Sequence, residues 1–323
     1  MRQTIEALIR RAGYGPHEPI VVGARRAGAD PVFVATGRTR DGAGLRADTL
    51  VYAASLSKQL TAACAALLVT RGALDPDAPL SRWLPELPAW AGAVRLRQLV
   101  HHTGALPADA EIDAAVAADG PADRTSHGVL DALSRTPVPP GVPGTEHVYS
   151  NAGYVCLAAA AARAAGRPLP DFAHRYLFEP LGMVDTRYWP GPLPAPARAA
   201  PLAAEHPAPL SLGDGGVWST AADLMRWNDA LNADRLGISD LLQTPGRLND
   251  GTVLDYAWGM GVRSRAGHTV YRHGGGWPGL RALAARVPDA GASLVIAAVA
   301  DDTERRVGLA DGLLDALLGT AAP

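Results

Sequence analysis

Ser55 and Lys58 are the pair of residues best suited to chemistry in this sequence. They are spaced i, i+3 at the start of a predicted helix over residues 55–71, so their side chains share one face. A serine hydroxyl is a weak nucleophile that needs a base within hydrogen-bond reach, and a lysine whose pKa is lowered by burial can be that base. The free N–H groups at the helix N-terminus can stabilise an oxyanion. Ser57 is next to Lys58 in the sequence, so its side chain points away from the face that Ser55 and Lys58 share. The alternative is that Ser55 only caps the helix and that Lys58 is solvated.

Lys58 is also the only lysine in the chain, and arginine supplies the other 29 of the 30 Lys and Arg residues. A codon bias towards arginine explains why surface lysines are missing, but it does not explain why one survives. Arginine stays protonated in proteins, whereas lysine can lose its proton at accessible pH. The composition therefore favours a chemical role for Lys58.

Tyr149 and Asn151 form a second candidate cluster, at the start of an alanine-rich helix predicted over residues 150–166. A tyrosine phenol can act as a base or an acid where nearby cations lower its pKa. The Asn151 amide can orient Lys58 or a substrate carbonyl. By itself the pattern also fits an ordinary helix cap with an aromatic neighbour.

A histidine followed by three glycines ends a strand predicted over residues 268–273. His273 precedes Gly274, Gly275 and Gly276, and glycines let a substrate backbone approach closely. The Gly276 N–H is a candidate oxyanion donor, and Trp277 is expected to line the substrate pocket. The alternative is a flexible hairpin turn.

The other histidines and the two cysteines have structural interpretations. His101, His102 and His127 are too dispersed for a metal site, and the sequence has no His-Glu-x-x-His or paired-cysteine spacing. We expect His102 to be a hydrogen-bonded structural residue. Cys64 and Cys156 are too few for a disulfide framework and are expected to be buried apolar side chains. The sequence therefore predicts neither a metal nor an organic cofactor.

These residues need a scaffold with strands at both ends of the chain and helices between them. Apolar β-forming runs predict strands over residues 19–27, 31–37, 257–264, 268–273, 280–287 and 292–300. Helical periodicity predicts further helices over 2–12, 95–102, 126–135, 170–181, 219–232 and 303–318. The economical arrangement is an α+β fold, with one antiparallel sheet built from the N- and C-terminal segments and flanked by helices.

The predicted organisation is a single catalytic domain over residues 1–323. Its sheet region covers about 1–75 and 250–323, and an inserted, mostly helical lobe covers about 76–249. The stretch 190–212 is rich in proline and alanine and is expected to be a long loop, a kind of segment that often serves as a functional lid.

Composition excludes several classes of function. The 323 residues are 48% hydrophobic with a net charge of −2, so no basic excess supports binding to nucleic acid or to an anionic membrane. No apolar run reaches the ~18 residues of a membrane span. The N-terminal residues lack the apolar core of a signal peptide. We therefore expect a cytoplasmic protein that binds neither nucleic acid nor a membrane.

Three further segments accompany the Ser-x-x-Lys, Tyr-x-Asn and His-x-Gly elements. They are Leu-Val-His-His-Thr-Gly at 99–104, Glu-Pro-Leu-Gly-Met at 179–183 and Gly-Gly-Val-Trp-Ser-Thr-Ala-Ala-Asp-Leu at 215–224. In this order, from about residue 20 to 315, the chain resembles the class C β-lactamase-related serine hydrolases, which are similar to penicillin-binding proteins. That family includes class C β-lactamases, D,D-peptidases, D-aminopeptidases, family VIII carboxylesterases and some acyltransferases.

The resemblance implies a β-lactamase/transpeptidase-like fold and a role for each site residue. Ser55 would be the acylated nucleophile and Lys58 the base that activates it. Tyr149 would carry the proton to the leaving group and later activate water. Asn151 would hold the substrate amide or carbonyl, and the backbone N–H groups of Ser55 and Gly276 would form the oxyanion hole.

His273 departs from the lysine that many β-lactamases carry at this position; the resemblance places it near the Tyr149 oxygen, where it would influence the protonation of the phenol. A histidine is neutral about as often as charged near pH 7, which weakens its hold on a substrate carboxylate. This favours esters or neutral acyl substrates, although Arg272 and Arg281 flank the site and can compensate. The usual serine after Thr103 is also missing, in a segment that we interpret as structural.

We therefore expect a serine hydrolase that acts through an acyl-enzyme on a small ester, amide or peptide substrate, with weak turnover of β-lactams or D-amino acid amides. A first alternative is an acyltransferase or peptide cyclase that uses the same acyl-enzyme in biosynthesis, with a carrier-protein-bound acyl donor. A second is a non-turnover acyl-binding or sensor protein. The intact Ser55, Lys58 and Tyr149 argue against a dead site.

Overall fold

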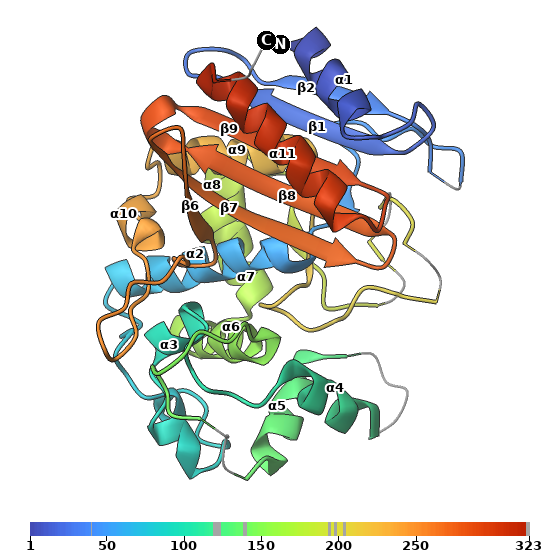
Figure 1. The fold of residues 1–323 in the computed structure, drawn as a ribbon. Coiled ribbons are helices and arrows are strands. Elements are labelled where there is room, and N and C mark those ends of the chain that lie inside the picture. Colours follow the sequence, from blue (N-terminus) through green and yellow to red (C-terminus); the bar gives the residue numbers. More distant parts are fainter. Residues whose placement is uncertain are drawn as a thin grey trace.

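Figure 1 shows the computed structural model, which describes residues 1–39, 41–118, 124–137, 141–192, 195–196, 199–202 and 205–320. A six-stranded antiparallel sheet has the order β2-β1-β9-β8-β7-β6. Its strands are β1 (Ile20–Arg25), β2 (Val32–Thr36), β6 (Gly261–Arg265), β7 (His268–Trp277), β8 (Leu280–Val287) and β9 (Ala292–Ala298). β1 pairs with β9, with Val22 opposite Ile296, so segments from both ends of the chain share one sheet. The predicted α+β fold is confirmed.

Alternate side chains of the sheet belong to two separate cores, as the two-residue period of a strand requires. Val22 and Ile296 pack in one core with α1 (Arg2–Arg11) and α11 (Thr303–Leu318). Their neighbours Val21 and Val295 face the opposite core, which contains α2 (Ser57–Thr70) and α9 (Ala221–Asn232). α1 and α11 therefore cover one face of the sheet, and α9 packs on the other (Figure 1).

The remaining elements form the helical region and join it to the sheet. α2 packs against α6 (Asn151–Ala165); both helices are rich in alanine and almost entirely buried. Around this pair lie η2 (Leu80–Arg82), η3 (Ala89–Gly92), α3 (Leu96–Val100), α4 (Asp109–Ala118), α5 (Ser126–Arg135), α7 (Leu169–Ala173), the π-helical turn η4 (His174–Phe178), α8 (Glu179–Leu181) and α10 (Ser239–Gln243).

A three-stranded sheet, β3-β5-β4, brings distant parts of the chain together. It consists of β3 (Val51–Tyr52), β4 (Arg187–Tyr188) and β5 (Val217–Ser219), and the 3-10 turns η1 (Ala54–Leu56) and η5 (Pro288–Ala290) complete the described elements. β3 leads directly into η1 and α2, so this small sheet sets the start of α2. In the part of the chain that the structure describes, no helix is long and apolar enough to cross a membrane.

Helix ends follow the sequence signals. Thr220 Oγ1 accepts the Asp223 N–H at 3.1 Å, as expected for the N-cap of α9. Gly166 ends α6 with a φ of 62°, a left-handed conformation that glycine adopts without steric cost.

The third and fourth predicted strands differ from the observed ones. β6 begins at residue 261 rather than 257, because Gly259 passes so close to α2 that a Cβ atom there would lie 2.7 Å from the Lys58 carbonyl oxygen. β7 continues from residue 273 to Trp277, so the glycine run is part of a strand and the hairpin-turn alternative is wrong.

Candidate active site

Ser55 lies on a tight turn between the small sheet and α2. It is the middle residue of η1, and the preceding Ala54 has a φ of 47°, a left-handed conformation that is uncommon outside glycine. Ser55 is half-buried and lines a cleft. Ser57 is fully buried instead, and its Oγ accepts the Val217 N–H at 3.1 Å. The structure therefore presents Ser55, and not Ser57, as the accessible hydroxyl.

Lys58 is fully buried beside Ser55. Its Nζ donates to Ser55 Oγ at 3.2 Å, to Asn151 Oδ1 at 2.7 Å and to the Asp214 backbone carbonyl at 2.9 Å. Burial lowers the pKa of Lys58 to about 8, although the carboxylates of Asp214 and Asp109 raise it. A lysine of this kind loses its proton close to neutral pH, which a base for Ser55 requires.

Tyr149 lies over both residues. Lys58 Nζ is 4.7 Å from the centroid of the Tyr149 ring, and the Ser55 side chain is close enough to the phenol to lower its pKa. Partial burial raises the pKa of Tyr149, and this effect outweighs the lowering by the Ser55 side chain. Tyr149 is therefore a protonated phenol at neutral pH, a form that can donate a proton to a leaving group.

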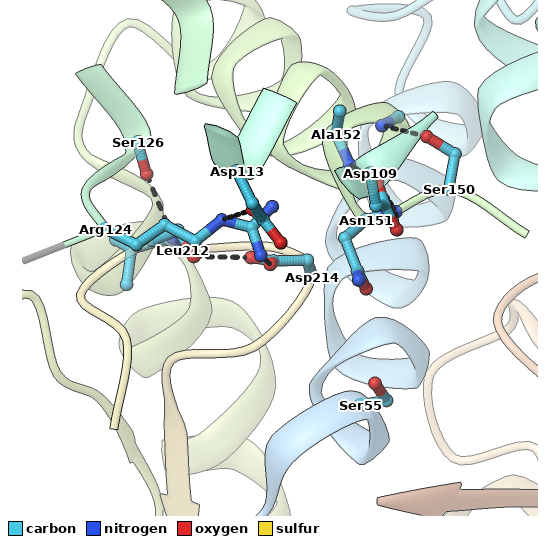
Figure 2. Close-up of polar contacts among 12 residues, drawn as sticks. Ser55, Asp109, Asp113, Arg124, Ser126, Ser150, Asn151, Ala152, Leu212 and Asp214 are labelled. Atoms are coloured by element: carbon cyan, nitrogen blue, oxygen red, sulfur yellow. Dashed lines mark hydrogen bonds and ion pairs between the residues drawn. The ribbon is translucent and has the colours of Figure 1, made fainter. Parts of the chain in front are cut away.

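Asn151 is held in place by the cap of α6 (Figure 2). Both carboxylate oxygens of Asp109 accept the Asn151 N–H at 2.9 Å, and Asp109 Oδ1 also accepts the Ala152 N–H at 3.2 Å. Ser150 Oγ accepts the Gly153 N–H at 3.0 Å. These bonds fix the first turn of α6, so the Asn151 amide is directed at Lys58.

The loop that supplies the Asp214 carbonyl is tied to α4 and α5 through an arginine (Figure 2). Arg124 Nη1 lies 3.6 Å from the Asp214 carboxylate, and Arg124 Nε lies 3.2 Å from Asp113. Ser126 Oγ accepts the Leu212 N–H at 2.9 Å. Sequence reasoning missed Asp109, Asp214 and Arg124, because nothing local in the sequence shows that their partners lie on other elements.

The end of β7 forms the wall opposite Ser55. β6 pairs with β7 only as far as Arg272, so the edge of residues 273–277 is not covered by β6 and lies beside η1. A Cβ atom on Gly275 would lie 2.3 Å from the Ala53 carbonyl oxygen, so only glycine permits this approach. The cleft between the two walls has a volume of about 500 Å³. It is lined by Ser55, Tyr149, His273, Gly274, Gly275, Gly276, Trp277, Pro278, Arg281, Asp301, Thr303 and Arg306.

His273 is buried and uncharged. Burial, with the charge of Lys58, lowers the pKa of His273 to about 3, and its Nδ1 donates to the Gly274 carbonyl at 2.6 Å. The expectation that His273 is charged about half the time near pH 7 is therefore wrong. Its ring centroid lies 6.2 Å from that of Tyr149, which places the two rings side by side in the wall of the cleft.

Trp277 forms the outer rim of the cleft. Its ring meets the Tyr52 ring edge-to-face at 6.2 Å, and its Nε1–H donates to the His206 carbonyl at 2.8 Å. His206, a described residue of the stretch predicted to be a long loop, thus contacts the rim of the cleft. The described residues include no cluster of three or more His, Cys, Asp or Glu side chains that could hold a metal ion.

The structure brings all the predicted site residues together. Ser55, Tyr149 and the 273–277 segment line the cleft. Lys58 is buried behind Ser55, and its Nζ joins Ser55 Oγ to Asn151 Oδ1 through two hydrogen bonds. Four segments that are distant in the sequence meet here: η1 with the start of α2, the start of α6, the loop before β5, and β7.

The comparisons with known proteins agree with this arrangement. The family model described as Beta-lactamase matches residues 19–318, so the chain belongs to the beta-lactamase family. The resemblance to β-lactamase-related serine hydrolases is thereby confirmed.

Two curated relatives and one solved structure illustrate the likeness. The D-alanyl-D-alanine-carboxypeptidase/endopeptidase AmpH of Escherichia coli is 32% identical over 67% of this chain and 59% of its own length. Esterase EstB of Burkholderia gladioli is 30% identical over 73% of this chain and 67% of its own. D-amino acid amidase from Ochrobactrum anthropi is 21% identical, with a TM-score of 0.82 over 98% of this chain and 99% of that one, which shows the same fold. The chain spans about three fifths of the AmpH length.

Proposed function

We propose that this chain is a serine hydrolase that forms an acyl-enzyme at Ser55 and hydrolyses small ester or amide substrates. The hydrogen bond of 3.2 Å between Lys58 Nζ and Ser55 Oγ carries the proposal, because the lysine is fully buried and its pKa is lowered to about 8. Family membership supports it.

The proposed reaction begins when neutral Lys58 takes the proton of the Ser55 hydroxyl and Oγ bonds to the substrate carbonyl carbon. The carbonyl oxygen becomes an oxyanion, which the backbone N–H groups of Ser55 and Gly276 stabilise. As the bond to the leaving group breaks, Tyr149 donates its proton to the leaving atom and recovers one from Lys58. Water then attacks the acyl-enzyme and loses a proton along the same path, which regenerates the Ser55 hydroxyl and releases the acid.

We propose that the preferred substrates carry neutral acyl groups. His273 is uncharged in the wall of the cleft, so it offers no cation to a substrate carboxylate. The two arginines expected to compensate already have partners. Arg272 binds Asp311 at 2.8 Å. Arg281 lines the cleft, where it donates to the Trp277 carbonyl at 2.7 Å and lies 3.4 Å from the Asp301 carboxylate. The relatives' names include an esterase and an amidase, which supports esters and amides as the substrate class.

Hydrolysis of p-nitrophenyl esters tests the proposal. The wild type should release p-nitrophenol in multiple turnovers, and Ser55→Ala should not. Ser57→Ala should keep its turnover number but lose about 1–3 kcal/mol of stability, because the buried Val217 N–H loses its acceptor. Equal losses of turnover in both variants would reject Ser55 as the nucleophile.

Acyl transfer is the second candidate function, with an amine or alcohol acceptor and a carrier-protein-bound donor. The contact between His206 on the long loop and Trp277 at the rim of the cleft favours it, because a loop at this position can exclude water. Product ratios measured with and without an added nucleophile separate transfer from hydrolysis.

We also propose that the protein acts in the cytoplasm. Cys64 and Cys156 are both buried free thiols, a state that suits a reducing compartment. Cell fractionation of the source organism tests this location.

A further inference from the structure

His102 makes contacts that the proposed reaction does not explain. It lies in the turn after α3, is 2% exposed and has a φ of 56°. Its ring packs against the ring of Tyr149, with centroids 4.3 Å apart. Left-handed backbone is uncommon for residues with side chains, although His and Asn adopt it more readily than most. The position is therefore specialised.

The backbone on both sides of Tyr149 is tied to His102. The Val148 N–H donates to the His102 carbonyl at 2.8 Å, and the Ser150 N–H donates to His102 Nδ1 at 3.1 Å. A residue between two such bonds cannot shift far along the chain direction. The packed imidazole also limits the rotation of the phenol ring. Tyr149 is itself 41% exposed at the cleft, so these contacts supply much of its support.

The same bonds fix the tautomer of the imidazole. Because His102 Nδ1 accepts a backbone N–H, it carries no proton, and the proton of the neutral ring is on Nε2. Nε2 then donates to Tyr256 Oη at 3.2 Å. Burial, with the charge of Lys58, lowers the pKa of His102 well below its usual range, so Nδ1 stays an acceptor at neutral pH.

We propose that His102 is a positioning residue for the proposed reaction: it clamps the backbone at Val148 and Ser150 and packs on Tyr149, which holds the phenol hydroxyl at Ser55. The inference rests on the proposed function, in which Tyr149 carries the proton to the leaving group. His102 acts only through Tyr149 and does not touch the reacting atoms.

The test compares His102→Leu, which removes the Nδ1 acceptor, with His102→Asn, whose Oδ1 is also attached to Cγ and can accept the Ser150 N–H. With an alkyl ester, whose alkoxide leaving group must be protonated, His102→Leu should lower kcat about 100-fold and change KM by less than about threefold. His102→Asn should restore kcat to within about tenfold of the wild type. Equal inactivity of the two variants would overturn the proposal. Should His102→Leu not fold, His102→Gly, which tolerates the left-handed backbone, takes its place.

His101→Leu is the matched control. His101 is also a buried histidine, but its ring nitrogens contact the carbonyls of Arg97 and Thr244, at 2.9 and 3.4 Å, and not the backbone on either side of Tyr149. It should lower Tm and leave the kcat of the folded protein unchanged. A loss of kcat that matches that of His102→Leu would overturn the proposal in favour of a general structural role.

A double-mutant cycle isolates the pathway through Tyr149. In a Tyr149→Phe background, the change His102→Leu should cost no more than about twofold in kcat, because the group that it positions is already gone. Equal costs in both backgrounds would overturn the proposal. Crystal structures give a readout independent of activity: the Tyr149 ring should move away from Ser55 in His102→Leu and stay in His102→Asn. A wild type that no ester acylates would reject the proposed function, while the crystal structures would still decide the role of His102.

Discussion

Asp214 interacts with Lys58 through its backbone carbonyl and through the charge of its carboxylate. Its backbone carbonyl accepts a hydrogen bond from Lys58 Nζ at 2.9 Å, and its carboxylate raises the pKa of Lys58 against the larger effect of burial. The carboxylate is in turn held by Ser211 Oγ at 2.9 Å and by the nearby Arg124. One residue thus both places the proposed base and sets the pH at which it loses its proton.

Replacing Asp214 by asparagine should move the pH dependence of the reaction. Asp214→Asn keeps the backbone carbonyl but removes the charge that stabilises the Lys58 ammonium, so the pKa of Lys58 should fall further. Since neutral Lys58 is the active base, the acidic limb of kcat/KM should move to lower pH. A pH–rate profile measures this shift. The control is Asp240→Asn, because Asp240 is exposed and is not among the charges that shift the pKa of Lys58. An unchanged limb, or one at higher pH, would contradict the link.

Lys58→Arg should be almost as damaging as Lys58→Met. An arginine keeps the positive charge but cannot lose its proton at accessible pH, so it cannot accept the Ser55 proton. Both variants should lose about 10²–10⁴-fold in kcat/KM, the range expected for loss of a general base. Steady-state kinetics at pH 8 measure this. A Lys58→Arg enzyme close to wild-type activity would remove Lys58 as the base.

Gly275 and Gly276 offer a matched pair of substitutions on one strand. A Cβ atom on Gly275 would lie 2.3 Å from the Ala53 carbonyl oxygen, whereas the nearest atoms to one on Gly276 are those of the Arg281 side chain, at 3.6 Å. Gly275→Ala should therefore push β7 and η1 apart, costing about 1–3 kcal/mol of stability and most of the activity. Gly276→Ala keeps its N–H and should do neither. Thermal unfolding and ester hydrolysis are the measurements, and equal effects would contradict the packing argument.

His273→Lys should shift the substrate preference towards carboxylates. The neutral imidazole of His273 gives no charge to the cleft wall, and a lysine at this position would supply one. The measurement is the ratio of kcat/KM for an ester with a carboxylate in its acyl part to that for a neutral isostere. We expect this ratio to rise about tenfold, in line with one charge-assisted hydrogen bond. A ratio that stays the same would show that His273 does not set this preference.

The nucleophile and its base could be predicted from the sequence because they are three residues apart on two adjoining helical elements, η1 and α2. Helical geometry alone places two side chains three residues apart on one face. The single lysine among 30 Lys and Arg residues is a second signal in the sequence for a chemical role. The strands near both ends of the chain could also be predicted, because their sequences are apolar runs of β-forming residues. The caps at Thr220 and Gly166 follow from side-chain and backbone chemistry over a few residues.

The supporting contacts could not be predicted, because they join residues far apart in the sequence. Asp109 caps a helix that begins 42 residues later, and the Asp214 carbonyl meets a lysine 156 residues earlier. The helix α4 could not be predicted either, because its sequence is too rich in alanine to show an apolar stripe on one face. β7 extends through three glycines to Trp277, although glycine has a low strand propensity. The glycines are explained by the close approach of Gly275 to the Ala53 carbonyl, which a side chain would block.

The intact mass of the protein after brief exposure to a p-nitrophenyl ester tests the central claim most directly. A parallel sample receives a penicillin, and Ser55→Ala and Ser57→Ala are treated in the same way. The account predicts an added acyl mass on the wild type and on Ser57→Ala, none on Ser55→Ala, and labelling by the ester in preference to the penicillin. An adduct of equal yield on Ser55→Ala would contradict acylation of Ser55, and with it the proposed reaction.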